Sequence, residues 1–169
     1  VEAASKQGGE CIGLVGLASP DLDDLTDRAA SLNSERMVLV GPDVYAWGEA
    51  QTAGGHLAAS ALAGVLTDQS DPALPLNGQV LYGLTGVSAV YEETQIDALV
   101  KGGVTVLECY GGKVSVMRGI TTRTKTGQTD DATFRELGTI LVVDDVIPAI
   151  RKSLRAKFVR AKNNALTRN

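Results

Sequence analysis

An apolar segment, a helical pattern and a second apolar segment follow one another near the start of the chain. ECIGLVGLASP (residues 10–20) and MVLVGPD (37–43) are short apolar runs that are typical of strands. Between them four apolar residues recur at helical spacing: Leu22, Leu25, Ala29 and Leu32. Ser19 or Asp21 lies where the N-cap of this helix is expected. The order predicts a βαβ unit with parallel strands and a right-handed crossover.

The remainder of the chain alternates further helical and extended patterns. A glycine pair at 111–112 predicts a hairpin turn between two of the strands. Asp144 or Asp145 is expected to cap the last helix, with Pro148 in its first turn. The predicted elements are helices over 52–70 and 89–101, an extended stretch over 79–87, strands over 104–110, 113–122 and 133–146, and a helix over 147–164. The predicted fold class is therefore α/β, a mixed β-sheet flanked by helices, with the βαβ unit at the N-terminal end and a long basic C-terminal helix.

Charge divides the chain into an acidic body and a basic tail. Residues 1–145 hold all 20 acids against 9 bases, whereas residues 146–169 hold 7 bases and no acid. The only aromatic residue of the basic helix, Phe158, lies on its apolar stripe, so a surface on which bases could stack is missing. No run of about 18 apolar residues exists. We therefore predict neither nucleic-acid binding nor membrane insertion.

Motifs that carry catalysis are weak in this sequence. The glycine pattern Gly13–Gly16 matches neither a dinucleotide-binding fingerprint nor a phosphate-binding P-loop. His56 is the only histidine and has no nucleophile motif to accompany it. Cys11 and Cys109 lie far apart and lack the spacing of zinc ligands. We expect no enzymatic activity, no catalytic residue, no cofactor and no metal.

Three segments, taken in order, resemble one family. They are HLAASALAGVLTDQSDPALPLNGQVLYGLTGV (56–87), EETQIDALVKGGVTVLECYGGKVSVMRGITT (92–122) and ILVVDDVIPAIRKSLRAKFVRAKNN (140–164). Together they resemble the tail sheath proteins of contractile-tailed bacteriophages over roughly residues 38–164. The turn Gly102–Val104, the strand motif Arg118–Thr122 and the acid before the last helix fit the family pattern.

The resemblance implies a structural function. Sheath subunits of this family polymerise as helical rings around the tail tube and contract to drive the tube through the host envelope. The implied partners are other sheath subunits, the tail tube protein, and the baseplate and tail terminator proteins. The implied location is the virion tail, after assembly in the host bacterial cytoplasm. No nucleotide is required, because the free energy comes from the difference between two sets of subunit contacts.

The resemblance also directs attention to the basic and hydroxyl side chains of KVSVMRGITTRTKTG (113–127) and of the last helix. No partner for phosphate binding or hydroxyl activation accompanies this stretch, which leaves a structural or protein contact. The candidate structural or inter-subunit contact residues are Arg118, Thr121, Thr122, Arg123, Lys125, Arg151, Arg155 and Arg160.

The chain is expected to be one sheath core domain over residues 1–169. Residues 1–9 and 163–169 are expected to be flexible ends, and the N- and C-terminal arms of the family are expected to be absent. Two alternatives stay open at this point. One is a small α/β nucleotide- or metal-binding enzyme domain that uses Gly13–Ser19 and Asp144, and the other is the sheath of a related tailocin or secretion machine.

Overall fold

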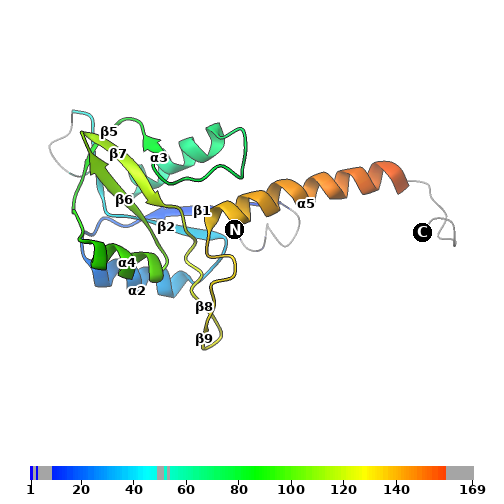
Figure 1. Ribbon diagram of the computed structural model, residues 1–169, viewed down its shortest axis with the longest axis horizontal. Helices are drawn as coiled ribbons and strands as arrows, with labels where there is room; N and C mark the ends of the chain where they lie inside the picture. The colour runs from blue at the N-terminus through cyan, green and yellow to red at the C-terminus, as the bar shows by residue number, and fades with distance from the viewer. Residues whose placement is uncertain (2, 4–8, 49–51, 53, 159–169) are drawn as a thin grey trace.

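The computed structural model describes residues 1, 3, 9–48, 52 and 54–158 (Figure 1). Residues 163–169 and most of 1–9, predicted to be flexible, lie outside the described residues. The elements are, in chain order, β1 (Gly13–Gly16), α2 (Leu22–Leu32), β2 (Met37–Gly41), β3 (Val44–Ala46), α3 (Gly55–Asp68), β4 (Val80–Leu81), β5 (Leu84–Val87), α4 (Glu93–Lys101), β6 (Val104–Tyr110), β7 (Lys113–Arg118), β8 (Lys125–Thr126), β9 (Thr129–Asp130) and α5 (Leu137–Phe158).

The main sheet has five strands in the order β1-β2-β6-β7-β4. Strands β1, β2 and β6 are parallel, whereas β7 and β4 pair antiparallel to their neighbours. The β1-α2-β2 unit confirms the parallel pair predicted from the sequence, and the sheet is mixed as expected. Two small two-stranded sheets, β3-β5 and β8-β9, complete the strands. The second of them lies between residues 122 and 133, where the sequence predicted no strand.

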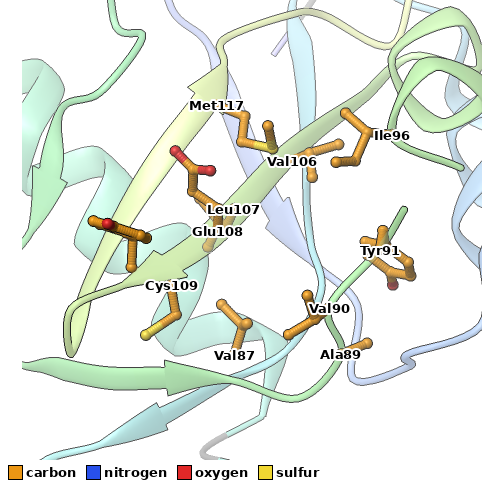
Figure 2. Close-up of a pocket in the computed structure, with 11 residues that line it drawn as sticks. Val87, Ala89, Val90, Tyr91, Ile96, Val106, Leu107, Glu108, Cys109 and Met117 are labelled. Atoms are coloured by element: carbon orange, nitrogen blue, oxygen red, sulfur yellow. The ribbon is translucent and has the colours of Figure 1, made fainter. Parts of the chain in front are cut away.

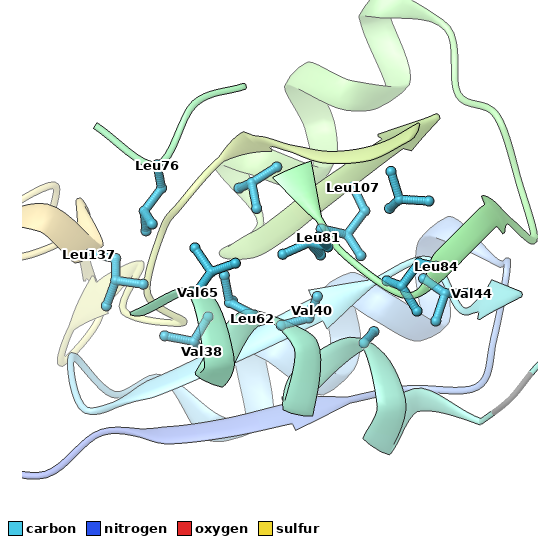
Figure 3. Close-up of a cluster of buried hydrophobic side chains, with 13 residues drawn as sticks. Val38, Val40, Val44, Leu62, Val65, Leu76, Leu81, Leu84, Leu107 and Leu137 are labelled. Atoms are coloured by element: carbon cyan, nitrogen blue, oxygen red, sulfur yellow. The ribbon is translucent and has the colours of Figure 1, made fainter. Parts of the chain in front are cut away.

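Hydrophobic cores lie on both faces of the sheet. On one face α3 packs Ala58, Leu62 and Val65 over Val38 and Val40 of β2 (Figure 3). On the other face α2 and α4 pack against the same strand and against β6, with the buried set Leu25, Ala29, Leu39, Leu99, Val104 and Val106. The alternation of β2 side chains between the two cores is what a strand covered on both faces requires.

Local signals in the sequence fix several turns and helix ends. The side chain of Asp21 accepts hydrogen bonds from the backbone N–H groups of Asp23 and Asp24, which makes it the N-cap of α2. Glu92 and Gln95 form a capping box at the start of α4. The residues at 111–112 both have positive φ, as a tight hairpin turn between β6 and β7 demands.

The largest error of the sequence-based prediction concerns residues 133–146. They do not form a strand; α5 begins at Leu137 and continues through Pro148 to Phe158 as one helix. The β-branched run suggested a strand, but Leu137 and Ile140, three residues apart, are both buried against the body, and this helical spacing prevails. Asp144 and Asp145 therefore lie inside the helix and cap nothing, which overturns the predicted capping role.

Helix α5 starts against the body and then leaves it. Figure 1 shows its second half extending away from the sheet and from the other helices. Side chains from Asp145 onward are mostly exposed, and several are large and apolar. No helix in the described part of the chain is both long and apolar enough to cross a membrane.

Gly16, the last residue of β1, and Gly55, the first residue of α3, allow the strand and the helix to pack closely. A Cβ placed on Gly16 would lie 1.7 Å from the carbonyl oxygen of Gly55, and a Cβ on Gly55 would lie 2.2 Å from the carbonyl carbon of Gly16. The two backbones touch where α3 begins, so neither position has room for a side chain. The Gly13–Gly16 pattern, which the enzyme alternative assigned to phosphate binding, thus ends in a contact between a strand and a helix.

This contact predicts opposite effects for one substitution at two glycines. Gly16→Ala should destabilise the fold by about 1–3 kcal/mol or more, because backbone atoms must move. Gly64→Ala, at an exposed position inside α3 with open space around its Cβ, should stabilise it by about 0.5–1 kcal/mol. Urea unfolding of both variants measures the free energies. If both substitutions changed the free energy of unfolding equally and in the same direction, the close contact between Gly16 and Gly55 would be contradicted.

Candidate subunit interface

The threonines that follow β7 are buried within this chain. The Thr121 hydroxyl donates to the carbonyl oxygen of Phe134 at 2.9 Å. The Thr122 hydroxyl donates to the carbonyl oxygen of Ser34 at 3.1 Å and accepts from the Ser34 N–H at 3.1 Å. Both side chains are fully buried. They therefore join the strand end to neighbouring loops, and a second subunit cannot reach them.

Arg123 connects the segment after β7 to two other loops. Its guanidinium forms ion pairs with Glu35, at 2.7 Å, and with Asp131, at 3.5 Å, and it donates to the Thr126 hydroxyl at 2.7 Å. These hydrogen bonds and charges raise the pKa of Arg123 despite opposing desolvation. Lys125, in the same segment, is exposed.

Asp131 is held as a carboxylate by the hairpin around it. Its pKa is well below the ordinary value, first because the Thr126 hydroxyl donates to it at 2.5 Å. The N–H of Thr133 at 2.8 Å and the charge of Arg123 add to the effect. Burial raises the pKa of Glu35, but a backbone hydrogen bond and Arg123 outweigh it, and the net shift is downward.

The other arginines of the candidate set lie nearer the surface. Arg118 is half-exposed and pairs with Glu136, which directly precedes α5, with its Nε 3.1 Å from Glu136 Oε1. Arg151 pairs with Glu10 at 2.5 Å. Arg155 is exposed and has no ion pair within the described part of the chain. Arg160 lies outside the described residues.

Asp144 has a structural partner in place of a catalytic or capping function. Its carboxylate pairs with the guanidinium of Arg36 at 2.5 Å, and both side chains are only 15% exposed. This ion pair fastens α5 to the loop before β2. Among the described residues, no group of three or more His, Cys, Asp or Glu side chains is placed to hold a metal ion. The two features of the enzyme alternative, the glycine pattern and Asp144, are thus both engaged in packing or pairing.

One apolar hollow lies on the sheet beside α4 (Figure 2). Its volume is about 130 Å³, and it is bordered by β6, β7 and the segment before α4. Val90 and Tyr110 at its border are 88% and 86% exposed, so the apolar surface continues outside the hollow. We use the name open sheet face for this surface, whose members are Val90, Ile96, Glu108, Tyr110 and Met117. Sequence reasoning missed it, because its residues come from three separate segments.

The Arg36–Asp144 pair predicts a clear difference between two adjacent carboxylates. Asp144→Ala should destabilise the chain by about 1–3 kcal/mol, because it leaves the Arg36 charge largely buried without its partner. Asp145→Ala, at the exposed neighbour, should change stability by less than about 0.5 kcal/mol. Urea unfolding measures both. A larger loss for Asp145→Ala would favour the capping role that the structure contradicts.

The pKa of Asp131 predicts how stability depends on pH. Because the folded pKa lies below the unfolded value of about 3.9, ionised Asp131 stabilises the fold above about pH 4. This contribution is lost as the pH falls through the lower, folded pKa. Asp131→Asn should therefore be less stable than the parent chain at pH 7, with a smaller difference at pH 2, and Asp130→Asn serves as the control. Titration of the Asp131 carboxyl near its ordinary pKa, followed by NMR, would contradict this.

The phage tail sheath protein central domain matches residues 1–122 of this chain. A search of curated proteins gives no match. Among solved structures, the sheath tail protein of Desulfitobacterium hafniense is 19% identical, with a TM-score of 0.71, over 99% of this chain and 37% of that protein.

Two further solved structures share the fold. The sheath tail protein of Listeria innocua is 15% identical, with a TM-score of 0.64, over 90% of this chain and 34% of its own. The helical sheath of the anti-feeding prophage in its contracted state is 19% identical, with a TM-score of 0.68, over 98% of this chain and 44% of its own. The chain thus spans less than half the length of each of these structures. The match over residues 1–122 covers most of the chain, and the chain belongs to the phage tail sheath protein family, of whose central domain it carries the fold.

Proposed function

We propose that this chain is the core of a structural subunit of a contractile tail sheath. The subunit polymerises as helical rings around a tail tube and contracts to drive the tube through the host cell envelope. The observation that carries the proposal is the family match over residues 1–122. The shared fold with a sheath solved in its contracted state supports it.

The described side chains agree with a protein that acts through subunit contacts. Glycines, carboxylates and threonines that could have formed a reactive site hold the fold together: Gly16 contacts Gly55, Asp144 pairs with Arg36, and Thr122 bonds to Ser34. Free energy for contraction then comes from the difference between two sets of subunit contacts, and the subunit itself is not an enzyme. Other copies of the subunit are its first partners, and the tail tube, baseplate and tail terminator proteins are the others.

The virion tail is the proposed location, with assembly in the cytoplasm of the host bacterium. A sheath of a related injection machine is the second candidate, because the anti-feeding prophage sheath and its baseplate both contain chains with this fold. In both cases the subunit has the same mechanical function. Only the particle to which the sheath belongs differs.

Electron microscopy of the complete gene product tests the function directly. We expect striated tubes, because each subunit repeats the same contacts along a helix. In dilute solution the 169-residue chain alone should be monomeric, since it spans less than half the length of the sheath structures that share its fold and offers correspondingly fewer subunit contacts. Calorimetric titration with nucleotides and divalent metals should show no saturable binding. A folded gene product that forms no tubes, or that binds a nucleotide saturably, would contradict the proposal.

Charge reversal on the basic tail tests how subunits recognise one another. Arg155→Glu combined with Arg160→Glu in the complete gene product should strongly reduce tube formation without changing the circular dichroism spectrum, because Arg155 is exposed and contributes nothing to the core. Arg28→Glu combined with Lys101→Glu makes the same change in net charge on the body and serves as the control. Normal tubes from the first variant would refute an assembly role for these cations.

A further inference from the structure

Two apolar surfaces of this chain have no partner within the described residues. The first is a stripe on α5, which we name the α5 stripe: Ile147, Ile150, Leu154 and Phe158. Their spacing of three and four residues places them on one side of the helix over about 17 Å. Between 37% and 52% of each side chain is exposed, because the helix has already left the body.

The second surface is the open sheet face. Helices α2 and α4 cover β2 and the start of β6 but stop short of the β6–β7 turn. In Figure 2 Met117, Val106 and Ile96 lie along one side of the hollow and Val87 and Val90 along another. The surface is a concave, mainly apolar hollow with aromatic and acidic side chains at its border. An apolar centre with a more polar border is typical of protein–protein interfaces.

Charges around the two surfaces are opposite in sign. From Val146 to Phe158 the helix carries four cations and no acid: Arg151, Lys152, Arg155 and Lys157. Four carboxylates lie on α4, at its start or in the open sheet face: Glu92, Glu93, Asp97 and Glu108. Two lysines oppose them, Lys113 beside the β6–β7 turn and Lys101 at the end of α4, which pairs with Asp97, so the carboxylates stay in excess. An apolar stripe flanked by cations therefore matches an apolar seat flanked by acids.

The positions of the two surfaces exclude contact within one copy. Figure 1 shows α5 extending from one side of the molecule, while the β6–β7 turn, which carries Tyr110, lies at the opposite side. We infer that the α5 stripe of one copy seats on the open sheet face of a second copy. Such a contact joins two different surfaces, so it can be repeated from copy to copy, as the rings and helices of a sheath require. The inference rests on the proposed sheath function and specifies one of its subunit contacts.

The size of the contact sets its strength. Four side chains on one helix offer far less than the roughly 800 Å² per partner of a stable interface. A single contact is therefore weak, and it becomes effective only where a lattice presents many copies together. This agrees with a chain that is monomeric when dilute.

Photo-cross-linking of the 169-residue chain tests the contact. A benzophenone amino acid replaces Leu154, and isotopically heavy and light chains are mixed at about 1 mM, where weak contacts are populated. We expect heavy–light adducts on the open sheet face, at Val90, Ile96 or Tyr110. The same probe at Ala149, exposed on another side of α5, should give at least tenfold fewer of them.

Two variants sharpen the result. Tyr110→Asp, at the exposed last residue of β6, should reduce the adducts from the Leu154 probe at least tenfold, and Phe158→Asp in the probe chain should do the same. The circular dichroism spectrum of each variant checks that the fold is retained. Adducts on α5 of the other copy, on any other surface, or none between copies would overturn the contact. Striated tubes from the complete gene product together with such a result would keep the proposed function and reject only this contact.

Discussion

The burial of β2 on both faces is the constraint on which the rest of the structure depends. Val38 and Val40 face α3, and Leu39 faces α2 and α4, so one strand of five residues carries both cores. Its parallel neighbours β1 and β6 satisfy its backbone on either side. A strand in this position tolerates no polar residue on either side, because neither face meets water.

Away from β2, apolar side chains become more exposed at two places, the second half of α5 and the end of β6. Helix α5 is held by its first turns, through Leu137, Ile140 and the Arg36–Asp144 pair, and farther along by the Arg151–Glu10 pair, while its apolar stripe is exposed to solvent. At the other end the sheet extends past α4 and leaves Tyr110 uncovered. A protein that acted alone would gain stability by covering these apolar groups. Their exposure agrees with the proposed sheath subunit, in which neighbouring copies would cover them.

The polar residues that drew attention in the sequence serve the interior. Thr122 bonds to Ser34 across a long separation in the chain, Arg123 ties three loops together, and Asp131 is kept ionised by hydroxyl and backbone donors. These contacts hold the end of β7 and the β8–β9 hairpin rigid beside the sheet. Such bracing would suit the sheath subunit that we propose, because deformation of the body would dissipate the displacement that subunit contacts produce.

The sequence by itself determined the elements whose signals are local. The βαβ unit follows from two apolar runs around a helical period, the α2 cap from Asp21, and the β6–β7 turn from two adjacent glycines that accept positive φ. The order of its motifs also predicted the family. Tertiary structure alone decided the state of residues 137–146, because β-branched residues favour a strand locally while burial of Leu137 and Ile140 at helical spacing favours a helix. It also decided that Thr121 and Thr122 are buried and that Val90, Ile96 and Tyr110 meet on one surface, since contacts between segments far apart in the chain leave no periodic signal in it.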